Sequence, residues 1–162
     1  MTDGQSCATW SAQPEKGNTQ QGAALRITTN STGVSRAITV TKNIMFGATW
    51  MFNVHVWDTS KRPANTGIGS ADMRSVVRGK PLPWHLCART RNNLLEMKVW
   101  TGSEPEPPWE DGSHTRSFRL ASDWVYPGRT GWYIGHVPPG GSAGFTNLKT
   151  WRLGRQISGP ES

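Results

Sequence analysis

The alternation of apolar and polar side chains over residues 86–100 is the feature that most constrains the fold. Leu95, Met97 and Val99 fall on one face of an extended chain, and the residues between them fall on the other. The pair Asn92-Asn93 interrupts the alternation, and asparagine tolerates the positive φ that a two-residue hairpin loop needs. A helix would require apolar residues at spacings of three and four. The sequence therefore predicts a β-hairpin in a sheet protein.

Turn-forming residues are spread along the whole chain, which carries 18 glycines and 11 prolines in 162 residues. This distribution favours many short strands, and we expect nine or ten, without a helix or an internal repeat. The predicted fold class is an all-β, antiparallel two-sheet β-sandwich. We expect an N-terminal arm or edge strand over 1–20, anchored by Trp10, one sandwich domain over 21–153 and a flexible tail over 154–162.

Residues 48–57 form the most apolar of the expected strands. Large side chains lie on both of its faces, with Trp50, Phe52, Val54 and Val56 on one and Met51, Asn53, His55 and Trp57 on the other. Such a strand belongs inside a sheet. We expect a long loop over 58–78, with at most a short strand at 74–77. A closing strand over 143–153 offers four packing candidates, Phe145, Leu148, Trp151 and Leu153.

The chain is basic, with 18 Lys and Arg against 11 Asp and Glu and a net charge of +7. An anionic partner or a solvated basic surface would both explain this charge. No basic run exceeds two residues, so nucleic acid is not the expected partner. The first ten residues lack a signal-peptide pattern, and no segment reaches the roughly 20 apolar residues of a membrane helix. Cys7 and Cys87 are either two buried thiols, which we favour, or one disulfide.

Catalytic and metal-binding patterns are absent from the sequence. A retaining glycosidase needs two carboxylates about 5–5.5 Å apart, and the acidic pairs Glu104/Glu106 and Glu110/Asp111 lie in a proline-broken loop. The histidines have no zinc-ligand spacing. Asp111, Asp123 and Asn147 could supply oxygens to calcium, but no Asp-x-Asp loop accompanies them. We therefore expect neither an enzyme nor a metal or other cofactor.

Four aromatic residues in loops or at strand ends could bind a glycan by stacking on sugar rings: Trp84, Trp109, Trp124 and Tyr126. The same residues could instead cap the two ends of the sandwich. Arg89 could stack on Trp100 and Trp109, with Glu106 pairing with its guanidinium and holding the loop across the sheet. That arrangement would make Glu106 and Trp109 structural rather than ligand-binding residues.

From about residue 74 to 153 the chain resembles the concanavalin A-like, laminin-G-like jelly-roll domains of actinobacteriophage minor tail proteins and other virion proteins. Four segments carry the resemblance: LCARTRNNLLEMKVW, SEPEPPWED, PGRTGWYIG and GGSAGFTNLKTWRL. Within them the matching positions are Arg89, Trp100, Glu106, Pro107, Trp109, Gly131, Phe145 and Asn147. The segment over 58–80 departs from the compact version of the family.

The resemblance implies a non-enzymatic bacteriophage virion protein, either an accessory minor tail protein or a capsid-decoration protein. Such a protein would fold in the host cytoplasm and join the particle in many copies beside other capsid or tail proteins. The arm and the tail would contact its neighbours, and the positive charge suits an acidic docking surface. The alternative is a carbohydrate-binding module or adhesin that recognises a cell-envelope glycan during host attachment.

Overall fold

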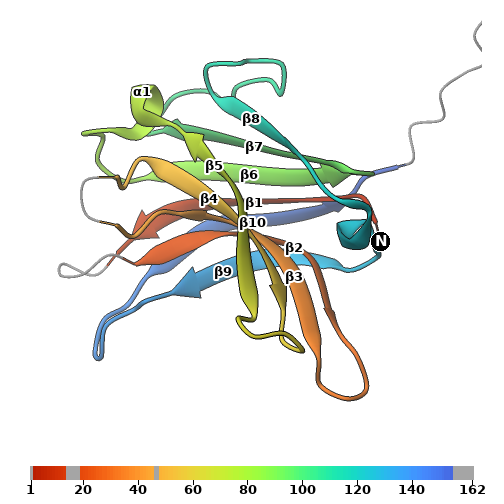
Figure 1. The fold of residues 1–162 in the computed structure, drawn as a ribbon. Coiled ribbons are helices and arrows are strands. Elements are labelled where there is room, and N and C mark those ends of the chain that lie inside the picture. The colour runs from red at the N-terminus through yellow and green to blue at the C-terminus, as the bar shows by residue number, and fades with distance from the viewer. Residues whose placement is uncertain (1, 14–18, 46–47, 155–162) are drawn as a thin grey trace, which may run out of the picture.

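The computed structural model describes residues 2–13, 19–45 and 48–154. Within these ranges the chain forms ten strands in two antiparallel five-stranded sheets. The sheets stack as the two layers of a sandwich, with β6, β7 and β8 above β2, β3 and β9 in Figure 1. The predicted all-β, antiparallel two-sheet fold is confirmed.

Each sheet contains strands from both halves of the chain. Sheet A has the order β10 (Gly144–Arg152), β1 (Gly4–Ala12), β6 (Trp84–Arg91), β7 (Leu94–Thr101) and β8 (Thr115–Arg119). Sheet B has the order β5 (Asn65–Asp72), β4 (Met51–Asp58), β3 (Ser35–Lys42), β2 (Gln20–Thr29) and β9 (Arg129–Gly135). The first two strands pair with the last two, β1 with β10 and β2 with β9, on opposite sheets. This nesting is consistent with a jelly roll.

The alternating segments form the expected strands. β6 and β7 pair in register from Arg91 and Leu94 outward to Trp84 and Thr101. Asn92 in the intervening turn has a φ of 53°, in the left-handed region that its side chain tolerates. β4 lies inside sheet B between β3 and β5, as its two apolar faces predict.

Two expectations about the segment after β4 are wrong. Strand β5 occupies much of the predicted loop, and residues 74–77 form the single helical turn α1 (Arg74–Val77) instead of a strand. β5 escapes a pattern search because its small and polar residues bury little. It is held by main-chain pairing with β4, which the side chains do not reveal. A 3₁₀ turn, η1 (Ser122–Trp124), follows β8.

The N-terminal strand occupies an interior position. β1 lies between β10 and β6, so residues 4–12 form neither an arm nor an edge strand. Residues 14–18 of the expected arm and 155–162 of the expected tail lie outside the described residues. Trp10 is buried in the core, where its ring lies 6.1 Å from that of Phe52 and 6.4 Å from that of Phe145.

The packing prediction for the closing strand is correct for Phe145 but wrong for two other residues. Leu148 and Trp151 are 49 % and 40 % exposed. The reason is the position of β10 at the edge of sheet A, where only β1 pairs with it. Side chains on an edge strand have a neighbour on one side only.

Arg26 is a buried cation inside the sandwich, with 1 % of its surface exposed. A break in the β2 register and a φ of 51° turn this residue out of the regular strand. Its guanidinium donates to the carbonyl oxygens of Thr2, Asn92 and Trp124. It also lies 3.9 Å from the Asp3 carboxylate. One side chain therefore joins the N-terminal segment, the β6–β7 turn and η1.

Candidate functional site

A disulfide forms the centre of the outer face of sheet A. Cys7 on β1 lies directly opposite Cys87 on β6, and the two sulfurs are bonded. The favoured prediction of two free thiols is therefore wrong. Spacing along the chain could not reveal the bond, because it depends on β1 lying beside β6. Trp100 packs against this pair, and Trp109 packs against the same cluster.

The loop between β7 and β8 is fixed to this face by Lys98. The ammonium of Lys98 donates to the carbonyl oxygen of Pro107 at 2.6 Å and lies 2.7 Å from the Glu106 carboxylate. The predicted pairing of Glu106 with Arg89 is wrong, since Arg89 is bonded to Glu96 at 2.6 Å. Arg89 and Glu96 are directly opposite each other on β6 and β7, so the guanidinium has a nearer carboxylate.

Trp109, near the middle of this loop, lies beneath two cations. The guanidinium carbon of Arg89 is 4.0 Å from the ring centroid, and the Lys98 ammonium is 4.6 Å from it. The expected stacking of Arg89 on Trp109 is confirmed. The ring of Trp100 stacks instead on His85, at 5.1 Å between centroids. Trp109 thus anchors the loop, and cation–π contacts strengthen that anchor.

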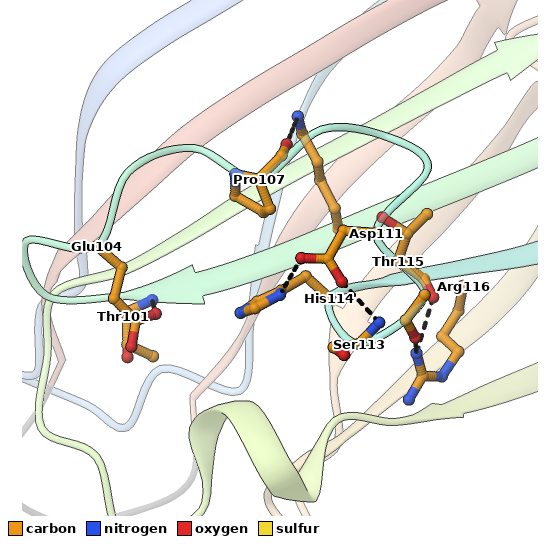
Figure 2. A network of polar contacts seen from close by, with 10 residues as sticks. Thr101, Glu104, Pro107, Asp111, Ser113, His114, Thr115 and Arg116 are labelled. Atoms are coloured by element: carbon orange, nitrogen blue, oxygen red, sulfur yellow. Dashed lines mark hydrogen bonds and ion pairs between the residues drawn. The ribbon is translucent and has the colours of Figure 1, made fainter.

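Hydrogen bonds within the loop keep its remaining residues in place (Figure 2). The Asp111 carboxylate accepts from the amide of Ser113 and from Nδ1 of His114, each at 2.8 Å. The Ser113 amide, followed by the His114 ring, lowers the pKa of Asp111 below its ordinary value. Glu104 accepts from the Thr101 amide at 3.1 Å. The loop therefore forms a fixed wall beside sheet A.

A groove of about 440 Å³ lies between this wall and β10. Thr9 and His85 contribute to its lining from the sheet, and Glu104 and Glu106 from the loop. Asn147, Lys149 and Trp151 line it from β10. The groove thus combines an exposed indole with hydroxyl, imidazole, amide and carboxylate groups, which suits a polar ligand that also has an apolar face.

His85 on β6 links β1 to the loop, and Thr9 extends this link to β10. A carbonyl oxygen only accepts, so Nε2–H of His85 donates to Gly102 O at 2.9 Å. In the neutral ring Nδ1 then accepts from the Thr9 hydroxyl at 2.9 Å. The Asn147 amide donates to that hydroxyl at 3.5 Å. β1, β6, β10 and the loop are joined through these contacts.

The four predicted glycan-contacting residues lie in three separate places. Trp84 packs on Trp10 at one end of the sandwich, with 5.6 Å between ring centroids. Trp109 lies under Arg89 beside the groove. Trp124 and Tyr126 lie together elsewhere, with the guanidinium carbon of Arg36 4.5 Å and 4.3 Å from their rings.

Sequence reasoning gave no site role to Thr9, His85, Lys149 or Trp151, all of which line the groove. The alternation of β10 does contain a usable signal, since Asn147, Lys149 and Trp151 fall on one face. Lys149 and Trp151 lie opposite Cys7 and Gln5 on β1, which places this face at the groove, and this register is known only from the fold.

The sequence offers three candidate oxygen donors to calcium. Asp111 is hydrogen-bonded to His114, Asp123 belongs to η1 and Asn147 lines the groove. Among residues 2–13, 19–45 and 48–154, no group of three or more His, Cys, Asp or Glu side chains could hold a metal ion. The same part of the chain has no helix with the length and apolarity to cross a bilayer.

Comparison with protein-family models, curated proteins and solved structures found no significant match.

Proposed function

We propose that this protein is a non-enzymatic component of a bacteriophage particle, an accessory minor tail or capsid-decoration protein present in many copies. The exposed edge strand β10 is the observation that supports this proposal most strongly. Most of its nine residues are exposed, and its outer main-chain groups lack a strand partner among the described residues. Long open edges are sites for pairing with another chain.

Apolar side chains accompany this open edge. Leu148 and Trp151 of β10 are 49 % and 40 % exposed, and Ile134 of β9 is 43 % exposed. β9 and β10 are edge strands of the two sheets and contact each other. Apolar residues beside an unpaired edge are a liability for a free protein and an advantage in an assembly.

Two further features agree with a passive component at a particle surface. The Cys7–Cys87 disulfide is a bond that persists in oxidising surroundings such as virion surfaces. Both groove carboxylates have partners, since Glu106 pairs with Lys98 and Glu104 accepts from the Thr101 amide. Both carboxylates are thus engaged by the protein itself, which agrees with a binding or structural role.

The test is incorporation into particles of the phage that encodes the chain. We expect purified particles to contain the protein in many copies by quantitative mass spectrometry, and Leu148→Lys on β10 to reduce its incorporation severalfold. Ile68→Lys is the matched control, because Ile68 is 39 % exposed on β5, an edge strand of the other sheet. Absence from purified particles would overturn the proposal, and equal loss in both variants would overturn the role of β10.

A second candidate function is recognition of a cell-envelope glycan, and the groove over sheet A favours it. Sugar rings combine an apolar face with hydroxyl groups. Trp151 offers the matching platform, while Asn147 and Glu104 offer an amide and a carboxylate. The predicted residues Trp124 and Tyr126 lie outside this groove, which makes them useful controls.

Calorimetric titration with host envelope polysaccharide tests the groove. We expect Trp151→Ala to weaken binding at least tenfold and Trp124→Ala to leave it within twofold, with both variants folded by circular dichroism. Wild-type protein that binds no envelope polysaccharide would remove the glycan function. The opposite ranking of the two variants would move the site from the groove to the Trp124–Tyr126 pair.

A further inference from the structure

An unpaired lysine lies inside one end of the sandwich. Lys42 is directly opposite Phe52 across β3 and β4, so its side chain shares the core face with that ring. Only 6 % of its surface is exposed. No ion pair or hydrogen bond of its ammonium occurs within the part of the chain that the structure describes. A buried cation without an anion is costly.

A second donor without a partner borders the same space. The indole nitrogen of Trp50 is buried and makes no hydrogen bond with the described residues. Indole N–H is only a donor, so an acceptor must satisfy it. Lys42 and Trp50 both line a pocket of about 340 Å³, separate from the groove over sheet A. Two donors without partners at one cavity indicate a missing acceptor.

The residues that line this pocket favour a negatively charged acceptor. Arg78 and Lys80 also line it, and its described lining contains no aspartate or glutamate. The guanidinium carbon of Arg78 lies 4.9 Å from the Trp50 ring centroid, which holds the cation at the pocket. Burial lowers the pKa of Lys42, and no carboxylate among the described residues counters it. An anion would restore the balance of charge.

The remaining wall of the pocket is aromatic and apolar. Trp84, Leu82 and Pro81 line it beside Trp50. Its volume is at the small end of ligand sites and matches a single ring rather than an extended polymer segment. From these contacts we infer that the pocket formed by Lys42, Trp50, Arg78 and Lys80 binds the anionic group, phosphate or carboxylate, of a small ring such as one sugar unit. This inference is independent of the proposed function.

Calorimetry with four probes tests the inference: glucose 6-phosphate, glucuronate, inorganic phosphate and glucose. We expect at least one anionic sugar to bind and glucose not to bind. The two sugars distinguish a phosphate from a carboxylate as the recognised group. Binding of inorganic phosphate as tightly as glucose 6-phosphate would overturn the aromatic wall as part of the site. Failure of both anionic sugars to bind would overturn the site itself.

Lys42→Met is the decisive variant, because methionine keeps an apolar stem and removes the unpaired ammonium. It should fold at least as stably as the wild type and bind the anionic sugar at least tenfold more weakly. Lys61→Met removes one positive charge at an exposed position outside this pocket and outside the groove over sheet A, and it should change affinity less than twofold. Equal weakening in the two variants would mean attraction by net charge and would overturn the inference.

Discussion

Lys98 and Glu106 form an ion pair in which only the cation is buried: Lys98 is 3 % exposed and Glu106 is 56 % exposed. The pair joins the floor of sheet A to the loop that covers it. Its energetic role is therefore asymmetric, since losing the carboxylate leaves a buried ammonium that keeps the Pro107 carbonyl and the Trp109 ring but has lost its charged partner. Losing the ammonium leaves an acid that water can solvate.

Glu106→Ala should lower the free energy of unfolding by about 1–2 kcal/mol, because the ammonium loses its charged hydrogen-bond partner. Urea denaturation followed by tryptophan fluorescence measures the change. Glu110→Ala is the control: Glu110 is exposed in the same loop, and its removal should change stability by less than about 0.5 kcal/mol. Equal effects would contradict a specific role for the Lys98–Glu106 pair.

Removing the disulfide should destabilise the protein substantially. Cys7 and Cys87 close a loop with a sequence separation of 80, and the chain-entropy relation gives about 4.5 kcal/mol for a loop of that size. We expect Cys7→Ala/Cys87→Ala to lower the urea midpoint by a corresponding amount, and reduction of the wild type to do the same. Intact-mass analysis after alkylation without reductant should find no reactive thiol. Two labelled thiols there would contradict the bond.

Arg26→Met should cost at least about 3 kcal/mol, since the carbonyl oxygens of Asn92 and Trp124 lose this donor at once and that of Thr2 keeps the Thr90 hydroxyl alone among the described residues. Arg26→Lys should recover only part of the loss, because one ammonium cannot reproduce the geometry of the guanidinium. Thermal unfolding compares these variants with Arg129→Met, which changes an exposed arginine of β9. Full stability in Arg26→Lys would mean that charge alone is needed.

The Asp111 carboxylate should make stability depend on pH. Its pKa is lowered in the folded state, chiefly by the Ser113 amide, so it stabilises the fold above its unfolded pKa of about 4. That stabilisation is lost as pH falls through the folded-state pKa. Asp111→Asn should therefore be less stable than the wild type at pH 7, and the difference should shrink below pH 4. A difference that is constant from pH 7 to pH 2.5 would contradict this linkage.

The sequence predicts the strands whose side chains alternate clearly. β4, β6 and β7 each bury one face in the core, so periodicity reports their conformation and their facing. β5 carries no such signal, because it is held by main-chain bonds to β4 and exposes most of its side chains.

The groove could be predicted only in part, because it depends on register between distant segments. Arg89 and Trp109 are predicted to meet and do so. The choice of Lys98 as the partner of Glu106 depends on how the loop crosses β7, and the disulfide depends on β1 lying beside β6. The local sequence pattern shows neither the Lys98–Glu106 pair nor the pairing of β1 with β6. Lys42 continues the core face of β3, but its lack of a partner among the described residues is visible only in three dimensions.

The interior position of β1 has a consequence for how the chain reaches its final form. β1 pairs with β6, and on its other side with β10, so both partners come from much later in the sequence. During synthesis, Trp10 and both backbone edges of β1 remain unpaired until β6 and β10 have left the ribosome. Strand pairing between segments far apart in the sequence slows folding and leaves aggregation-prone intermediates exposed. Refolding yield should thus fall steeply with protein concentration, and chaperone supply during expression should decide how much native material is recovered.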